Sequence, residues 1–254
     1  MKVRTLLACS LAVLALAACN KNKDEGAGTS PAAAEDKIIV TTANPPPGGT
    51  WADVANETSA GGVVMGNPNA KVKLLEIGSL FCPYCKRFED EGSPQLVEHY
   101  VKTGNVSWEF RPYAIHGPID VAADIVVRCN GAKTFFPLSM ALYKDQQVLE
   151  EKVRDVPQDK LNAMQNLPTN QVFIAWANLL GLQDWAAARG VPQAKSNQCL
   201  ADQKMIDREV QVMSDVNSQF PEFSGTPGFA LNGKFLPKIG SWKELQPKLD
   251  EALK

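Results

Sequence analysis

The sequence predicts an α/β fold whose strands lie on both sides of a long helical segment. Residues 62–65 and 72–77 are short apolar runs separated by a Gly-Asn-Pro-Asn turn, which is typical of two neighbouring strands. A third strand is expected over residues 106–113, and residues 119–199 have a largely helical pattern. Asn-Gly at 232–233 lies between two further apolar runs and predicts a β-hairpin.

Apolar spacing places the helices more closely. A helix is expected to begin at Cys82 and run towards Val101, with a bend near Gly92-Ser93-Pro94, because proline removes an internal hydrogen bond. Two further helices each show one apolar face, formed by Phe173, Trp176, Leu179 and Leu180 and by Ile206, Val210, Met213 and Val216. A last helix follows Ser241, a good N-cap.

Composition excludes several classes of function. The chain has 254 residues, 44% hydrophobic and 21% charged, and a formal net charge of −2. These values are typical of a globular protein, and the dispersed charge argues against nucleic acid as a partner. With only two histidines, His99 and His116, a histidine-rich metal site is nearly excluded. We expect no bound cofactor and no metal.

Residues 1–18 resemble an export signal. Lys2 and Arg4 precede the apolar stretch 6–18, which is shorter than the roughly 20 residues of a membrane-spanning helix. The run Leu16-Ala17-Ala18-Cys19 resembles the lipobox of bacterial lipoproteins, which predicts cleavage before Cys19 and lipidation of its thiol. Several acyl chains would give stable anchoring. The alternative is ordinary cleavage after Ala17, which would leave a soluble exported protein.

Residues 19–50 are predicted to be a flexible tether. The segment 20–36 is polar and rich in Ala, Gly and Ser, and the Pro-Pro-Pro-Gly-Gly run at 45–49 favours extended polyproline geometry. The short apolar run 38–40 leaves an added edge strand open as an alternative.

The chemistry is expected at Cys82-Pro83-Tyr84-Cys85. A strand that leads into C-x-x-C and then into a helix favours a thiolate, because the unpaired N–H groups of the helix N-terminus stabilise an anion. Pro83 suits the first helical turn. We expect Cys82 to be the accessible, attacking thiol and Cys85 the buried, resolving one. Half a zinc site is the alternative for a lone C-x-x-C.

The segment 72–88, which contains this motif, resembles the active-site segment of DsbA-like thiol-disulfide oxidoreductases. Gly-Thr-Pro-Gly-Phe at 225–229 is similar to the cis-proline loop that faces the active site in thioredoxin folds. The resemblance covers residues 51–254. It implies a thioredoxin fold with an inserted helical domain, in which residues 51–116 and 200–254 form the thioredoxin-like domain and residues 117–199 the insertion.

The resemblance also implies roles for individual residues. Thr226-Pro227 would be a cis bond that exposes the Thr226 backbone beside Cys82, so that a substrate peptide adds as an extended strand. Glu76 matches a buried glutamate that takes part in proton transfer with the buried cysteine. The alternative for Glu76 is a solvated glutamate at the end of a strand. Tyr84 departs from the histidine of strongly oxidising members, so we expect a weaker oxidant.

Cys129 and Cys199 resemble a structural disulfide found in some DsbA-like proteins, and a second redox pair is the alternative. Cys9 lies in the predicted signal and Cys19 is the predicted lipidation site, which leaves four thiols. This even number favours disulfides in an oxidising compartment. Trp176 and Trp185 could line a peptide groove, although aromatic residues at helical spacing are usually core.

The sequence therefore predicts thiol-disulfide exchange on exported cysteine-containing proteins, with disulfide oxidase activity favoured and a membrane redox partner that resets the pair. The expected location is the bacterial cell envelope, facing the periplasm. A disulfide isomerase or reductase kept reduced by its membrane partner is one alternative, because Tyr84 and Thr226 also occur in such members. A non-catalytic module that holds unfolded clients is another.

Overall fold

The computed structural model describes residues 37–40 and 44–254, all of them within one unit that spans residues 33–254. The predicted signal (1–18), the predicted lipidation site Cys19 and most of the predicted tether lie outside the described residues. Within the described ranges, no helix combines the length and apolar character needed to span a bilayer.

The described strands form one sheet with the order β1-β2-β3-β5-β4-β6-β7. Strands β4 and β5 are parallel, and every other neighbouring pair is antiparallel. The strand bounds are β1 Ile38–Ile39, β2 Ala55–Thr58, β3 Val63–Met65, β4 Val72–Gly78, β5 Val106–Pro112, β6 Gly228–Leu231 and β7 Lys234–Phe235. The predicted α/β class is thus confirmed.

Most of the helices lie between β5 and β6, where the sequence predicts the helical segment. The helical elements are η1 Trp51–Asp53, α1 Pro83–Glu91, α2 Ser93–Leu96, η2 Val97–Val101, α3 Pro118–Arg128, α4 Ala132–Arg154, α5 Gln158–Met164, α6 Thr169–Leu180, α7 Leu182–Ala187, α8 Gln193–Ala201, α9 Gln203–Gln219 and α10 Trp242–Leu253. The helix that follows Cys82 is interrupted at Gly92, where the sequence predicts a bend, because α1 ends at Glu91 and α2 begins at Ser93.

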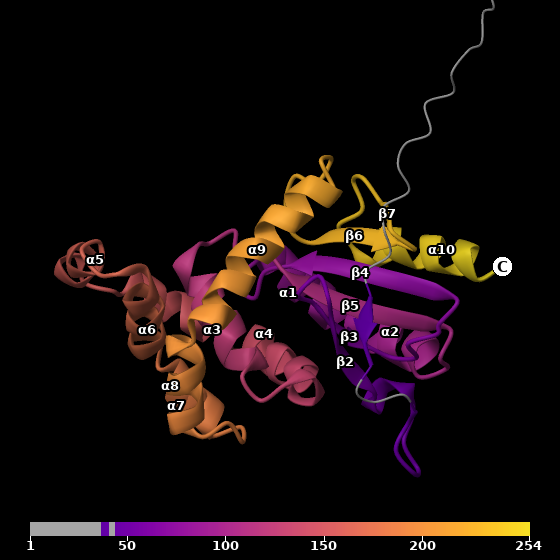
Figure 1. Cartoon of the computed structure of the whole chain (residues 1–254). Helices are drawn as coiled ribbons and strands as arrows, with labels where there is room; N and C mark the ends of the chain where they lie inside the picture. Colours follow the sequence, from indigo (N-terminus) through magenta and orange to yellow (C-terminus); the bar gives the residue numbers. More distant parts are fainter. Residues whose placement is uncertain (1–36, 41–43) are drawn as a thin grey trace, which may run out of the picture. The chain divides into compact units, whose positions relative to one another are not determined.

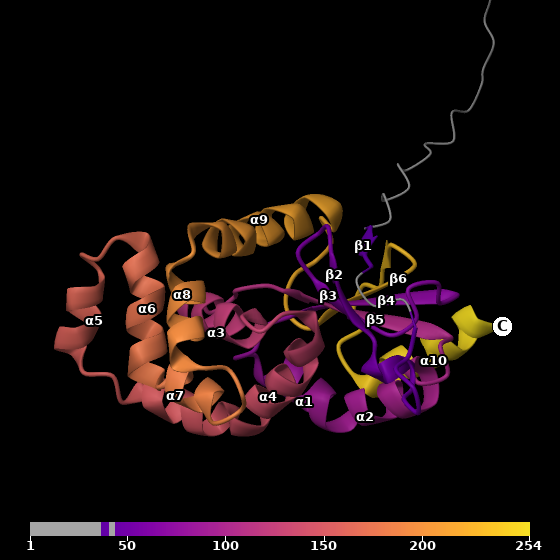
Figure 2. The ribbon, with the colours of Figure 1, turned by 60° about the horizontal axis from the view of Figure 1, so that its bottom comes forward.

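Helices cover both faces of the sheet (Figures 1 and 2). Helix α9 lies on one face, and α1, α4 and α10 lie on the other. The alternation of side chains along β4 explains this arrangement, because neighbouring residues point to opposite faces. Leu74 belongs to the main core, whereas Leu75 and Ile77 form a smaller cluster with Val212 and Val216 of α9. Strand β4 is therefore covered on both sides.

The C-terminal hairpin and last helix form as predicted. Asn232 and Gly233 join β6 to β7 with φ of 48° and 78°, the left-handed values that an Asn-Gly turn requires. The Asn232 side-chain oxygen also accepts a hydrogen bond from the Lys73 backbone N–H at 2.8 Å, which ties the hairpin to β4. Ser241 and Glu244 form a capping box at the start of α10.

Two predictions about the chain before the core strands need correction or completion. The apolar run at 38–40 contains β1, which pairs with β2, so this part of the predicted tether belongs to the sheet. The run 45–49 contains a turn closed by a Gly49 N–H to Pro46 carbonyl bond of 2.8 Å, and Gly48 has φ of 76°. The predicted polyproline geometry is therefore wrong there, because glycine at that φ reverses the chain.

The predicted apolar face of α9 is also partly wrong. Val210 is 60% exposed, and the buried positions are Ile206, Glu209, Val212 and Val216. Glu209 is buried because Arg128 of α3 lies 3.3 Å from its carboxyl group. Glu209 therefore takes a core position of α9 that an apolar side chain would normally fill, and burial raises the pKa of its carboxyl group well above the usual value.

Candidate active site

Cys82 lies at the junction between the sheet and α1. Residues 79–81 connect the end of β4 to Cys82, which is the N-cap of α1, and Pro83 is the first helical residue. The Cys82 side chain makes no capping hydrogen bond, so the N–H groups of the first turn remain available to a thiolate. Both Cys82 and Cys85 are unpaired thiols in this structure.

The two thiols have opposite electrostatic environments. The pKa of Cys82 is lowered from 9.0 to about 5, chiefly because the Cys85 thiol donates a hydrogen bond to it. Burial opposes this shift, and the Thr226 side chain and the backbone N–H groups of Tyr84 and Cys85 support it. The pKa of Cys85 is raised well above its usual value, because it is fully buried and lies beside Cys82 and Glu76. Near neutral pH, Cys82 is therefore the thiolate and Cys85 the thiol.

The predicted accessibility of Cys82 is wrong for this conformation. Cys82 is only 2% exposed, although it is less deeply buried than Cys85. The loop before β6 covers it, because the Cys82 thiol lies 3.3 Å from the Thr226 carbonyl oxygen. A substrate sulfur must therefore approach along this loop.

Alkylation of the reduced protein is expected to follow the lowered pKa of Cys82. The rate of reaction with iodoacetamide should rise with a midpoint near pH 5, because only the thiolate attacks, and Cys85 should stay unmodified at neutral pH. The same shift makes the reduced fold lose stability as pH falls from about 9 through 5, since a depressed pKa favours the folded thiolate. A midpoint near pH 9, measured by peptide mass spectrometry, would contradict this environment.

The loop opposite Cys82 has the geometry that the resemblance implies. The Thr226-Pro227 peptide bond is cis. Gly228, the next residue, leaves room for the Phe223 ring, since a Cβ there would lie 2.7 Å from it. The carbonyl of Thr226 points at the Cys82 sulfur, so an extended peptide bound to this loop would lie beside the reactive atom.

Glu76 is buried in β4, not solvated. It is 2% exposed and accepts a hydrogen bond from the Trp108 indole N–H at 3.0 Å. Burial is the main reason that its pKa is raised well above 4.5, with a smaller contribution from Glu89, and the Trp108 bond opposes the rise. Near Cys85, protonated Glu76 can donate its proton to the Cys85 thiolate, and the Glu76 carboxylate can accept the proton of the Cys85 thiol.

Glu89 is a second titratable group that sequence reasoning missed. It lies in α1 one turn after Cys85, and burial raises its pKa to about 7, against a hydrogen bond from Ser93. Its charge in turn raises the pKa of Glu76. The spacing of four residues after Cys85 could have indicated that Glu89 shares a helix face with it.

Hydrogen bonds also fix the loop that precedes Cys82. Tyr143 of α4 donates to the Ser79 carbonyl at 3.1 Å, and the Gln146 side-chain amide donates to the carbonyls of Leu80 at 2.9 Å and Cys82 at 3.2 Å. Helix α4, within the predicted insertion, therefore positions the backbone of the motif. No local sequence pattern indicates this contact.

Tyr84 is an exposed residue of the motif. Its side chain is 58% exposed, and the guanidinium of Arg87 lies 5.3 Å from the centre of its ring. The ring presents an apolar surface next to the thiols, with a cation above it. It supplies no imidazole to Cys82.

Cys129 and Cys199 form a disulfide in the structure. The bond joins the end of α3 to α8, and the two cysteines are 70 positions apart in the sequence. Trp176 and Trp185 both pack against the main core, and the Trp185 indole N–H donates to Asp145 at 2.8 Å. The structure thus gives both tryptophans core contacts.

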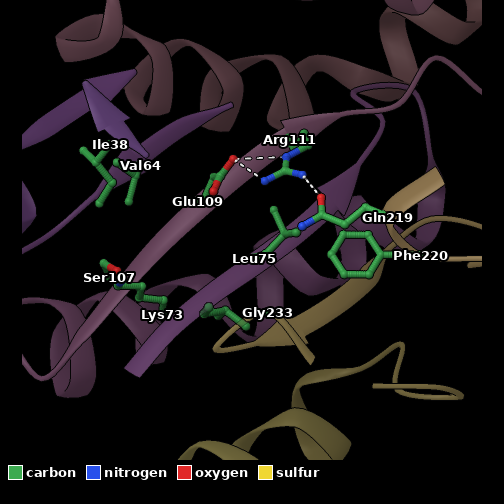
Figure 3. A pocket seen from close by; sticks show the side chains of 11 residues that line it. Ile38, Val64, Lys73, Leu75, Ser107, Glu109, Arg111, Gln219, Phe220 and Gly233 are labelled. Atoms are coloured by element: carbon green, nitrogen blue, oxygen red, sulfur yellow. Dashed lines mark hydrogen bonds and ion pairs between the residues drawn. The ribbon is translucent and has the colours of Figure 1, made fainter. Parts of the chain in front are cut away.

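A hollow on the α9 face of the sheet has none of the predicted site residues (Figure 3). It has a volume of about 50 Å³, and Arg111 lies within it between Glu109 and Gln219, at 2.9 Å and 2.8 Å. Helix α1 lies on the opposite face of the sheet. Among the described residues, no group of three or more metal-ligating side chains is arranged to hold a metal ion.

Comparison with known proteins gives consistent relationships. A Rickettsia bellii protein, named provisionally as a protein-disulfide oxidoreductase, is 25% identical over 174 residues. That match covers 67% of this chain and 57% of the relative, so the chain spans little more than half the length of the curated Rickettsia relatives.

Solved structures show the same fold. A protein-disulfide isomerase from Novosphingobium aromaticivorans has a TM-score of 0.70 and 26% identity, over 75% of this chain and 96% of that one. Wolbachia pipientis alpha-DsbA1 has a TM-score of 0.59 and 20% identity, over 75% and 89%. The fold is thus the predicted thioredoxin fold, as found in DsbA-like proteins. The thioredoxin family model matches residues 58–251, well over half of the sequence, and the chain belongs to that family.

Proposed function

We propose that this protein catalyses thiol-disulfide exchange and acts mainly as a disulfide oxidase. One observation carries the proposal: the pKa of Cys82 is lowered to about 5 at the start of α1, while the pKa of Cys85, one turn later, is raised. One thiol can thus attack or leave as a thiolate while the other holds its proton. The Rickettsia relatives, named provisionally as protein-disulfide oxidoreductases, support the same class of reaction.

As an oxidase, the protein begins with a Cys82–Cys85 disulfide. A substrate thiolate attacks the Cys82 sulfur, the Cys82–Cys85 bond breaks, and Cys85 leaves and takes a proton. A second substrate thiolate then attacks the substrate sulfur of the mixed disulfide, and Cys82 leaves as a thiolate. Two electrons pass from the substrate to the enzyme. We assign Glu76 as the group that exchanges the proton with Cys85, because both are buried and the charge of Glu76 raises the pKa of Cys85.

The lowered pKa of Cys82 also favours the direction of oxidation. A stable Cys82 thiolate is a good leaving group and stabilises the reduced enzyme, so the disulfide form is readily given up to substrates. Disulfide isomerase activity is the second candidate. It is favoured by the isomerase name of the Novosphingobium structure and by Tyr84, which leaves the motif without a histidine.

The proposal includes a location and partners. Residues 1–18 act as an export signal, Cys19 is lipidated, and the catalytic unit faces the periplasm of a bacterial envelope. The substrates are exported cysteine-containing proteins, and a membrane redox partner resets the Cys82–Cys85 pair. The Cys129–Cys199 disulfide supports an oxidising compartment. Residues 51–116 and 200–254 then act as the catalytic domain, with 117–199 as the insertion.

A folding assay separates the candidates. The oxidised protein, added in equal amount to a reduced and unfolded disulfide protein, should introduce disulfides within minutes and become reduced itself. An isomerase would act only on a scrambled substrate and in its reduced form. Suppressed aggregation without any change in substrate thiols, and with equal effect from Cys82→Ser, would overturn the proposal in favour of a client-binding module.

A further inference from the structure

We propose that His116 is a positioning residue that holds a positive charge near the Cys82 thiolate and thereby stabilises the reduced state of the Cys82–Cys85 pair. The inference rests on the proposed function, since it concerns how the same site is tuned. It starts from a difference in the motif. Tyr84 has no charge to offer Cys82, so any stabilising cation must come from elsewhere in the fold.

The two cations next to the motif in sequence are already engaged. Lys86 forms an ion pair with Asp90 at 2.6 Å, and the Arg87 guanidinium lies over the Tyr84 ring at 5.3 Å. Arg87 is exposed and Lys86 is half-buried. The loop between β5 and α3 supplies a different cation, His116.

Asp120 holds His116 in place. One oxygen of the Asp120 carboxylate accepts from the His116 backbone N–H at 2.8 Å and lies 3.1 Å from the imidazole Nδ1. The other oxygen accepts from the Ser79 hydroxyl at 2.9 Å and from the Phe81 backbone N–H at 3.3 Å. One buried carboxylate thus joins the imidazole to Ser79 and Phe81, in the segment that leads into Cys82.

The imidazole faces the active-site side of this junction. His116 lines a surface pocket of about 240 Å³ together with Phe81 and Pro83, the two neighbours of Cys82 in the sequence. The hydrogen bond to Asp120 is the main reason that the pKa of His116 is raised. Partial burial opposes the rise, and the charges of Asp120, Cys82 and Glu150 add to it. The imidazolium and the Cys82 thiolate therefore favour each other.

The charged groups around His116 come from three elements. Asp120 belongs to α3, Cys82 begins α1, and Glu150 and Arg154 of α4 line the same pocket. Arg154 is mostly exposed and lies 3.9 Å from Glu151, so it opposes the imidazolium only weakly. The net environment of His116 is negative, which favours its protonated form while Cys82 is reduced.

The strongest contributions to the lowered pKa of Cys82 are hydrogen bonds, chiefly from Cys85. His116 is therefore expected to add a moderate effect. For a charge pair at the protein surface, we expect the equilibrium constant with glutathione to change about three- to fivefold. This corresponds to a shift of about half a unit in the pKa of each partner.

Thermodynamic linkage between the charges of His116 and Cys82 gives a test that distinguishes this role from a purely structural one. If the thiolate stabilises the imidazolium, the pKa of His116 must fall by the same amount when the thiolate is removed. The chain has only two histidines, and His99 is exposed on η2. In full-length His99→Gln, the single remaining imidazole signal in the NMR spectrum reports His116 alone.

We expect the His116 titration midpoint to be lower in oxidised His99→Gln, and lower in His99→Gln/Cys82→Ser, than in reduced His99→Gln. We also expect His116→Gln to make the pair three- to fivefold less oxidising against glutathione at pH 7, and His116→Lys to restore it. An identical midpoint in the three thiol states would overturn the inference, even if His116→Gln does not fold. Failure of the wild-type pair to exchange with glutathione would overturn the proposed function instead, and the comparison with Cys82→Ser would still decide the role of His116.

Discussion

Replacing Cys82 with serine is expected to abolish disulfide exchange, at least a thousandfold by order of magnitude, because an alcohol at this position has no accessible anion at neutral pH and is a poor partner for sulfur. Replacing Cys85 has a different result. The Cys85→Ser variant keeps Cys82 and a hydroxyl that can donate to it in place of the Cys85 thiol, but it loses the resolving sulfur, so it should accumulate as a mixed disulfide with its substrates. Non-reducing electrophoresis and mass spectrometry of the purified variants measure both outcomes.

The two substitutions control for each other, since each exchanges one sulfur for one oxygen at a buried position. Circular dichroism and urea unfolding establish that both variants are folded. If purified Cys85→Ser carried no mixed disulfide with substrate, and Cys82→Ser carried one, the roles assigned to the two thiols would be reversed. Equal residual activity in both variants would place the reactive sulfur elsewhere.

Removing the Cys129–Cys199 disulfide is expected to destabilise the protein by about 4 kcal/mol in the chain-entropy description, because the bond closes a loop of 70 residues. The double variant Cys129→Ala/Cys199→Ala tests this by urea denaturation of the oxidised protein. The loss should appear mainly in the helices α4 to α8, because the closed loop begins just after α3 and ends within α8.

The equilibrium of the Cys82–Cys85 pair with glutathione, compared between Cys129→Ala/Cys199→Ala and the wild type, shows whether the second disulfide is structural. A structural bond should leave this equilibrium unchanged once the variant is folded. A shift of tenfold or more, with stability preserved, would identify Cys129 and Cys199 as a second redox pair, the alternative for cysteines outside a C-x-x-C motif.

The fold was largely predictable because its main strands and the active-site helix carry strong local patterns. Apolar runs indicate β3 and β4, the alternation of Val106, Trp108 and Phe110 with polar residues indicates β5, and Asn-Gly at 232–233 specifies the hairpin. Strand β2 could not be predicted in this way. Its sequence is Ala-Asn-Glu-Thr, and the burial of Asn56 and Thr58 depends on the neighbouring strands.

Some residues of the candidate site could likewise be predicted from local motifs, and others depend on tertiary contacts. Cys82, Cys85, Pro83 and the Thr226-Pro227 loop are evident from short motifs, and the structure brings Cys82 and Thr226 together. His116 is separated from Cys82 by a complete helix–strand unit, so its place near the thiol follows only from the β4–β5 pairing and Asp120. Glu209 is a similar case, because the burial of a carboxyl group in α9 could be expected only with knowledge of its partner Arg128.

The equilibrium of the Cys82–Cys85 pair with a glutathione series, measured on the full chain by thiol alkylation and mass spectrometry, tests the central claim most directly. The pKa of about 5 at Cys82 lies between the values of about 3.5 in DsbA and about 7 in thioredoxin. We therefore predict a potential near −200 mV, between about −120 and −230 mV, the range of a moderate disulfide donor. A potential below about −250 mV would contradict the oxidase proposal, and a pair that never exchanges would contradict an enzymatic role for the site.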